Sequence, residues 1–333
     1  MNKQRYRVVF NLFRSALTVV GETARAAGKE AGGDGDVAAR EPAVRSVDAW
    51  LRPVVFSLWG ALGWVSVQAN AQVVADPSAP GNERPTVLNA PNGVPLVNIQ
   101  TPSAAGVSRN VYSQFDVAQQ GAILNNSRSA TATQLGGWVQ GNPWLAAGSA
   151  RVILNEVRSS HPSALRGYVE VAGQRAQVVI ANPAGIHCDG CGFINANRAT
   201  LTTGAPIITG GELTGYRVQG GRIAIEGAGM DASGTDYTDL IARAVQINAG
   251  LWAKELNVVT GSQTVVHTDE AAPSVGDALS ATDAVPGFAI DVAQLGGMYA
   301  GKILLVGTEA GVGVRNAGEI GAAVGEVIVT AEG

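Results

Sequence analysis

Short runs of aliphatic residues recur along the last third of the chain at a spacing of roughly twenty residues, which is in the range of β-solenoid coils. The repeats cover residues 217–333, and one of them reads IARAVQINAGLWAKELNVVTG. Each alternates two or three apolar residues with Gly, Asn or Ala at the expected turns. Such a unit buries its apolar side only by stacking on a neighbouring copy. The pattern therefore predicts an all-β chain wound as a solenoid.

Residues 178–206 show the same β pattern in more detail. The apolar run 178–180 is typical of a buried strand, and residues 192–195 and 199–203 are predicted as two further strands. Apolar residues do not recur at a helical period in this stretch. The close spacing of strands and turns indicates β structure built from repeated turns and argues against an enzyme pocket.

The first 71 residues have the order of a targeting segment and are excluded from the predicted fold. We divide them into an extended basic region (1–29), a polar spacer with a basic region (30–53), and an apolar core with a cleavage site (54–71). Ala69 and Ala71 form the small-x-small site, so that Gln72 becomes the first residue of the mature chain. The alternative is a transmembrane anchor, which is disfavoured because the apolar run is shorter than the ~20 residues that span a bilayer.

Charge limits the partners of the mature chain. Nine of the 23 Lys and Arg residues and six of the 27 Asp and Glu residues lie in the first 71 positions. The remainder therefore carries 14 basic and 21 acidic residues, a net charge of −7. Nucleic-acid binding requires a basic footprint. We therefore expect no nucleic-acid partner.

A turn and a pair of cysteines follow the first strand of residues 178–206. In the turn, Asn182 can cap through its side chain, Pro183 fixes one φ angle, and Gly185 can take a positive φ. Cys188 and Cys191 come next and are the only cysteines in the sequence. We expect them in a tight, disulfide-sized loop between strands.

The two cysteines allow a disulfide, a redox pair or half of a zinc site. A structural disulfide is favoured, because a signal peptide leads to an oxidising compartment. His187 adjoins the pair as a third candidate zinc ligand, but the sequence has no second CxxC and no HxxxH. A thioredoxin-like role requires a βαβ context, which is not visible. We expect no bound metal and no cofactor.

The sequence lacks the common catalytic signatures. His161, His187 and His267 lie far apart, and each is predicted at the surface or in a turn. Neither a GxSxG elbow nor HExxH is present, although Ser and Asp are too plentiful for counting to exclude a Ser-His-Asp triad. A polysaccharide lyase would need clustered Asp, Lys and Arg, yet the mature chain has only two lysines, Lys254 and Lys302. We expect no enzyme activity.

Several other segments carry local predictions. Residues 150–157 are predicted as a strand from their β-branched content. Residues 168–171 and 176–180 form either a hairpin or two successive coils. Tyr112 and Phe115 are predicted to pack in the core or in a cap. The residues predicted to lie at coil corners, where asparagine caps turns, are Asn197 with Arg198, Asn248 and Asn316.

Two Asn-Pro segments carry a resemblance to a known family. Asn182, Pro183, Ala184, Gly185 and Ile186 look like the NPNGI motif of the two-partner-secretion (TPS) domain, and the CDGCGFIN segment after them is similar to the same family. That domain is found at the N-terminus of filamentous haemagglutinin-like exoproteins and of CdiA-type contact-dependent inhibition toxins. The family's NPNL motif is matched by Asn142, Pro143, Trp144 and Leu145. Ala184 and Trp144 depart from the second Asn of each motif.

The resemblance implies a fold and a division of the chain. The implied fold is a right-handed parallel β-helix with short extra-helical hairpins and an N-terminal cap over residues 72–100. Residues 1–29 resemble the extended signal peptide region of large exoproteins. Residues 72–333 would form the TPS domain and run into the first β-helix repeats. The last repeat stops in mid-pattern, so we expect either the front of a longer exoprotein or a truncated gene product.

The resemblance also implies a function in export. The general secretory machinery would carry the chain across the inner membrane. An outer-membrane TpsB transporter with POTRA domains would then bind the TPS domain in the periplasm, before folding at the cell surface. The alternative function is an adhesin or haemagglutinin that binds glycans or a receptor on a host or neighbouring cell through the β-helix surface. For the Asn-Pro turns, the alternative to a role in secretion is a role in folding alone.

Overall fold

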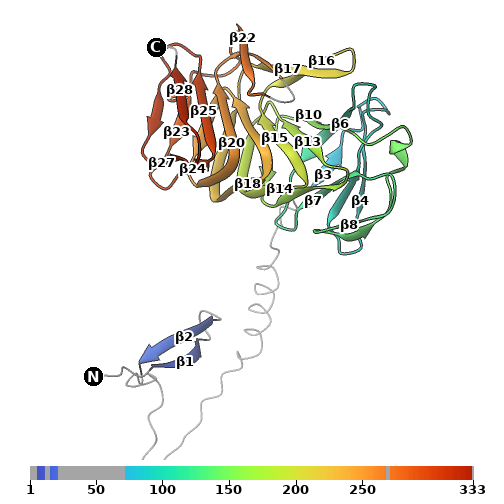
Figure 1. Cartoon of the computed structure of the whole chain (residues 1–333), viewed down its shortest axis with the longest axis horizontal. Coiled ribbons are helices and arrows are strands. Elements are labelled where there is room, and N and C mark those ends of the chain that lie inside the picture. Colours follow the sequence, from blue (N-terminus) through green and yellow to red (C-terminus); the bar gives the residue numbers. More distant parts are fainter. Residues whose placement is uncertain (1–5, 12–15, 22–71, 268–270, 332–333) are drawn as a thin grey trace, which may run out of the picture. The chain divides into compact units, whose positions relative to one another are not determined.

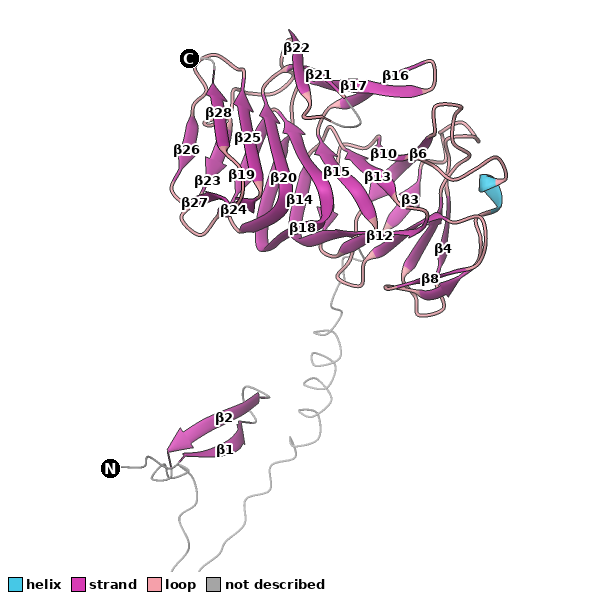
Figure 2. Cartoon of the chain, viewed as in Figure 1, coloured by secondary structure: helices cyan, strands magenta, loops and turns pink. Residues whose placement is uncertain are grey.

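The computed structural model describes residues 6–11, 16–21, 72–267 and 271–331. It separates into two units, residues 1–67 and residues 68–333. In the first unit β1 (Tyr6–Asn11) pairs antiparallel with β2 (Ala16–Gly21). In the described part of the second unit, strands joined by loops form the structure, and one turn of 3-10 helix, η1 (Pro143–Leu145), is present (Figure 2). Across the described ranges no helix has the length and apolarity to span a membrane.

The second unit is a parallel β-helix (Figure 1), and its parallel strand pairings follow three faces, named here face 1, face 2 and face 3. Face 1 consists of β6 (Val107–Phe115), β10 (Val152–Val157), β13 (Ala176–Ala181), β15 (Ala196–Thr202), the last parts of β18 (Arg222–Ala242) and β20 (Gly250–Thr260), β25 (Lys302–Gly307) and β28 (Val327–Ala331). Face 2 consists of β11 (Ser163–Leu165), the first parts of β14 (Ile186–Ile194) and β18, β19 (Ala244–Ile247), β23 (Ile290–Val292) and β26 (Val314–Asn316). Face 3 consists of β5 (Pro95–Asn98), β7 (Ala122–Asn126), β12 (Tyr168–Gly173), the second part of β14, the middle of β18, the first part of β20, β24 (Gly297–Ala300) and β27 (Glu319–Ala322). The predicted β-solenoid is confirmed.

The length of each coil explains why the repeats are visible only in part of the sequence. On face 1, Val152 pairs with Gln177, which is 25 residues further along the chain. Arg198 pairs with Tyr237, 39 residues further along, because a hairpin is inserted between them. The predicted spacing of about twenty residues therefore describes the uninterrupted coils.

Alternation along each strand divides its residues between the interior and the outer surface. In β13, Val178 and Ile180 belong to the central apolar core, whereas Val179 and Ala181 belong to a second cluster outside it. All four are buried. A strand with both sides buried reads as a continuous apolar run, which is how residues 178–180 were recognisable from sequence.

The second cluster is covered by a sheet outside the helix. Its strands are β16 (Ala205–Thr209), β17 (Glu212–Val218), β21 (Gln263–Val266) and β22 (Ser274–Ala278), all antiparallel. Leu213, Tyr216 and Val265 of this sheet pack with Val179 and Ile241 of face 1. This outer sheet therefore buries apolar side chains that face 1 would otherwise expose.

Antiparallel strands cover the first coil. β3 (Val73–Ala75) pairs antiparallel with β6, and β4 (Thr86–Asn89) pairs antiparallel with β5. A further hairpin, β8 (Thr131–Thr133) with β9 (Gly137–Val139), lies over face 3. Tyr112 and Phe115 are buried with ring centroids 5.0 Å apart, as predicted for core or cap residues. These strands pair with the edge that the first coil would otherwise expose.

Three local predictions need correction, and one open alternative is decided. The cysteines do not lie in a loop, because β14 runs through both of them. Of the two arrangements left open for residues 168–180, the hairpin is excluded, since β12 belongs to face 3 and β13 to face 1. Asn197 and Arg198 lie within β15 and not at a corner, and Arg198 is fully buried. His267 is buried, although a surface or turn position was expected. Asn248 lies between β19 and β20, as predicted for a corner, and Asn195 lies at the corner between β14 and β15 with a φ of 58°.

Candidate functional site

The first Asn-Pro segment forms the turn that leads into η1. Asn142 has its side-chain oxygen 3.0 Å from the backbone nitrogen of Trp144, which donates to it. Its side-chain nitrogen donates to the carbonyl oxygens of Ile99 and Asn125, at 2.8 and 2.9 Å. Only 3% of Asn142 is exposed. The side chain therefore caps its own turn and ties it to β7 and to the residue that follows β5.

The second Asn-Pro segment repeats this bonding at the end of β13. The side-chain oxygen of Asn182 accepts a hydrogen bond of 2.9 Å from the backbone nitrogen of Ala184. Its side-chain nitrogen donates to the carbonyl oxygen of His161 and to Oγ of Ser163, both at 3.0 Å. Asn182 is fully buried. Each asparagine thus uses both ends of its amide, which is the condition for burying it without a penalty.

The geometry of the turns explains why Trp144 and Ala184 can replace the second Asn of the two family motifs. In both turns the third residue contributes its backbone N–H, not its side chain. Trp144 and Ala184 can therefore stand where each motif has a second Asn without loss of the turn. Trp144 is 45% exposed, and its indole nitrogen donates to Oγ1 of Thr86 at 3.3 Å.

The remaining motif residues divide between surface and core. Pro143 and Pro183 are exposed. Leu145 and Ile186 are fully buried in the central core. Gly185 has a φ of 121°, and a Cβ there would lie 3.1 Å from the carbonyl oxygen of Arg222. The glycine is therefore required by backbone conformation and by its neighbour.

The two turns occupy different corners of the helix. The Asn142 turn lies between β9 and β10, where the chain passes to face 1. The Asn182 turn lies between β13 and β14, where the chain passes from face 1 to face 2. They are therefore two separate elements and do not form a single pocket.

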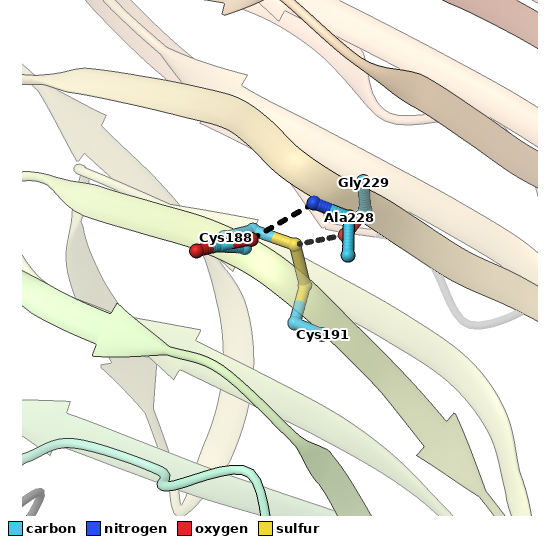
Figure 3. Close-up of a disulfide and its surroundings, with 5 residues drawn as sticks. Cys188, Cys191, Ala228 and Gly229 are labelled. Atoms are coloured by element: carbon cyan, nitrogen blue, oxygen red, sulfur yellow. Dashed lines mark hydrogen bonds between the residues drawn. A yellow bond between two sulfur atoms is a disulfide. The ribbon is translucent and has the colours of Figure 1, made fainter. Parts of the chain in front are cut away.

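The cysteines form a disulfide inside the corner between face 2 and face 3 (Figure 3). Cys188 pairs with Ile225 in the first part of β14, which ends at Asp189, and Cys191 begins the part that pairs from Met230 onward. Both are buried in the central core, and Cys188 Sγ lies 3.3 Å from the carbonyl oxygen of Gly229. The backbone nitrogen of Ala228 donates to Oδ1 of Asp189, which stabilises the matching corner of the next coil.

His187, considered above as a third zinc ligand, lies beside a carboxylate from the next coil. Its Nδ1 lies 3.5 Å from Oε1 of Glu226, and both side chains are nearly half exposed. Exposed pairs of this kind contribute little to stability. Within the described ranges, no group of three or more His, Cys, Asp and Glu side chains is placed to hold a metal ion.

The expected processing site lies at the edge of the described region. Ala69 and Ala71, like the apolar run 54–67, fall outside the described residues. Gln72 is exposed, and its carbonyl oxygen accepts a hydrogen bond of 3.1 Å from the backbone nitrogen of Asp116. The first residue expected in the mature chain is therefore tied to the first coil.

A buried ion pair was not found from the sequence. Nε of Arg198 lies 2.6 Å from Oδ2 of Asp239, with 1% and 0% of the side chains exposed. Thr200 and Asn257 also bond to this carboxylate, and Arg198 donates to the carbonyl oxygen of Ala271. Arg198 and Asp239 lie on neighbouring strands, but they are separated by an inserted hairpin. No local pattern in the sequence marks that pairing.

Comparisons with known proteins agree with this geometry. A family model described as the TPS secretion domain matches residues 71–333, and one described as the Extended Signal Peptide of Type V secretion system matches residues 1–49. The chain is 56% identical over 336 residues to Toxin CdiA of Yersinia pestis and 49% identical over 343 residues to tRNA nuclease CdiA-2 of Burkholderia pseudomallei (strain 1026b). Each alignment covers 100% of this chain and 10% of the relative, so the chain spans about a tenth of their length.

A solved structure shares the fold. The crystal structure of a filamentous hemagglutinin secretion domain matches with a TM-score of 0.68 and 36% sequence identity. The match covers 75% of this chain and 83% of that chain. The right-handed parallel β-helix predicted from the motifs is thereby confirmed.

Proposed function

Because this chain belongs to the family of TPS secretion domains, we propose that a TpsB transporter recognises its two Asn-Pro segments before they fold. The chain is the secretion domain of a CdiA- or filamentous haemagglutinin-type exoprotein and carries an extended signal peptide. Such a protein passes through the periplasm of a Gram-negative bacterium to the cell surface. The TPS family implies a TpsB transporter as the partner class.

Burial of the asparagines is the observation that carries the proposal. Asn142 and Asn182 are 3% and 0% exposed in the folded domain, so a partner cannot reach their side chains there. In the unfolded chain both amides are available. Recognition of Asn142 and Asn182 therefore has to precede folding, while the folded turns offer only Pro143, Trp144 and Pro183 at the surface.

Strand addition is the mode of binding that suits this chain. POTRA domains present exposed strand edges, and an extended segment can pair with such an edge through its main chain. Folding then competes with the transporter for the same backbone groups. Each coil that stacks at the cell surface buries apolar area worth roughly 25 cal/mol per Å², which favours release outward.

The test compares two pairs of buried asparagines. In the first variant, Asn142→Ala and Asn182→Ala remove both motif amides. In the matched control, Asn110→Ala and Asn155→Ala remove two amides that are equally buried and hydrogen-bonded in β6 and β10. Both variants lose folding energy, but only the first changes the proposed recognition segments.

The readout is the amount of mature chain in the medium, with and without a co-expressed TpsB transporter. We expect the motif variant to be released roughly tenfold less than the control, the effect of about 1.4 kcal/mol of binding free energy. Thermal unfolding of both purified variants checks that they are comparably destabilised. Equal release of the two would contradict the proposal and assign the turns to folding alone.

We infer no catalytic step for this chain. The nuclease activity in the name of the Burkholderia relative belongs to a protein of which this chain spans about a tenth. The contact to a POTRA domain and any receptor on a target cell are likewise proposals for the longer protein. A purified chain that degraded tRNA would contradict this assignment.

A further inference from the structure

Two large aromatic side chains lie exposed on the outside of face 3. Trp252 on β20 and Tyr299 on β24 are paired in register on adjacent strands. Their ring centroids are 6.2 Å apart and their planes differ by 19°. Trp252 is 46% exposed and Tyr299 is 37% exposed. Neighbouring exposed aromatic rings form a patch that water solvates poorly, which marks a binding surface more often than an isolated apolar residue does.

Glycines hold both rings against the sheet. Gly250 and Gly297 lie two positions before Trp252 and Tyr299 on the same strands, and they also pair with each other. A Cβ at Gly250 would lie 2.5 Å from Cη2 of Trp252, and a Cβ at Gly297 would lie 2.7 Å from Oη of Tyr299. The rings therefore lean along their strands over the glycines and do not stand out from the sheet.

These rings belong to a longer row along the helix. Its members are in register on six successive strands of face 3: Tyr168, Gly192, Asp231, Trp252, Tyr299 and Gly321. We call this set the aromatic row. Tyr168 leans over Gly192, where a Cβ would lie 2.4 Å from its Cε1. With strands about 4.8 Å apart, the row is roughly 24 Å long.

Carboxylates flank the rings. Oη of Tyr168 donates to Oδ2 of Asp231 at 2.8 Å, and Oη of Tyr299 donates to Oε2 of Glu319 at 2.9 Å. Burial raises the pKa of Asp231, but hydrogen bonds from Ser233 and Tyr168 lower it, and the pKa stays below its usual value. Asp231 is therefore ionised at neutral pH and can accept further hydrogen bonds.

The row is uncovered in the part of the chain that the structure describes. Elsewhere the chain covers outward apolar residues with its own strands, as the sheet of β16, β17, β21 and β22 does over face 1. Over face 3 the hairpin β8–β9 covers Ile123 and Ala172, which lie in the first coils. Trp252 and Tyr299 belong to later coils that no such hairpin reaches.

We propose that the aromatic row binds a linear, neutral, β-1,4-linked polysaccharide that lies along the helix axis. The C–H faces of pyranose rings pack on aromatic rings, whose π faces carry partial negative charge. Successive sugars of such a chain advance by a length close to the strand spacing, so several units meet the row at once. Asp231 and Glu319 accept hydrogen bonds from sugar hydroxyl groups, and their negative charge disfavours sulfated and uronic-acid polymers.

This proposal does not depend on export, and it gives the adhesin alternative a defined surface.

The test uses the purified full chain and cellohexaose as the probe, and binding is measured by titration calorimetry and tryptophan fluorescence. We expect saturable binding that Trp252→Ala weakens by roughly tenfold or more, since stacking on one large ring is lost. Gly250→Ala keeps the indole but displaces it, and it should weaken binding as well.

Matched controls separate the row from other exposed aromatics. Trp138 is 72% exposed on β9, outside the row, and Trp138→Ala should leave the affinity unchanged. Unchanged far-UV circular dichroism and melting temperature show that each variant is folded. The α-linked maltohexaose and an acidic oligogalacturonate should both bind more weakly than cellohexaose. Failure of the parent chain to bind cellohexaose, unchanged affinity in Trp252→Ala, or preference for either competitor would overturn the proposal.

Discussion

At the scale of single residues, the folded Asn-Pro turns use only some of the side chains that the sequence motifs specify. Asn142 and Asn182 each make one acceptor bond to the backbone two residues later and two donor bonds to distant groups. To the cap of each turn, the position after proline contributes its backbone N–H. A sequence motif therefore records four side chains where the folded turn uses one amide, one proline and, in the second turn, one glycine.

The second turn offers a direct measurement of this division. Asn182→Ala leaves the acceptor oxygen of His161 and the N–H of Ala184 without their present partner, so we expect a loss of about 1–3 kcal/mol in the free energy of unfolding. Ala184→Asn restores the family motif at a half-buried position. It should change the free energy of unfolding by no more than about 0.5 kcal/mol. Urea unfolding followed by circular dichroism measures both; a large effect of Ala184→Asn would show that its side chain has a role in this turn.

At the scale of elements, strands inserted between coils cover the outer surface of face 1. β16 and β17 leave the helix after β15, and β21 and β22 leave it after β20. Both excursions start from face 1, and together they make one sheet over it. The Arg198–Asp239 pair lies beneath, where Arg198 also reaches the carbonyl of Ala271 between β21 and β22. The Arg198–Asp239 pair therefore links the outer sheet to face 1, which that sheet covers.

Breaking this pair should loosen the outer sheet before the helix. Arg198→Met leaves the buried carboxylate of Asp239 without its charge partner, and we expect a loss of about 3–5 kcal/mol in the free energy of unfolding. Replacing both residues, as Arg198→Met with Asp239→Leu, should recover much of that loss. Hydrogen exchange should show faster exchange in β21 and β22 than in β13 of the single variant. Equal exchange in all three strands would contradict the fastening role.

At the scale of the whole molecule, a solenoid suits the proposed export of the chain before it folds. Each coil contacts its neighbours, so folding can advance one coil at a time along the sequence. The disulfide fits this order, because Cys188 and Cys191 are three residues apart and close a very small loop. Such a loop leaves the rest of the chain extended, whereas a long-range disulfide would not.

Processing of the leader is the prediction that belongs to the whole chain. Cleavage after Ala71 should give a released protein whose first residue is Gln72, as measured by mass spectrometry of the N-terminus. Ala71→Phe should block cleavage and lower the amount released, because the small-residue pocket of the peptidase cannot accept the ring. A mature protein that starts at another residue would show that the cleavage site was assigned wrongly.

The sequence by itself determined the β-solenoid, the strand at 178–180, both Asn-Pro turns and the family. All of these depend on residues that are close together in the chain, such as a proline beside its asparagine or an apolar run between turns. Arg198 was misplaced at a corner because its partner Asp239 is 41 residues away, beyond an inserted hairpin. His267 was misplaced for a related reason. Its ring packs against Tyr216 of β17, a strand of the outer sheet that lies far away in the sequence.

Only the tertiary structure decided which residues meet between coils. Trp252 and Tyr299 are 47 positions apart in sequence, yet the β-helix puts them in register on adjacent strands. Burial of Asn142 and Asn182 likewise follows from strands that close over them from other coils. The physical reason is that short-range sequence fixes the conformation of each turn and strand, whereas inter-strand register depends on the summed length of every insertion between two coils.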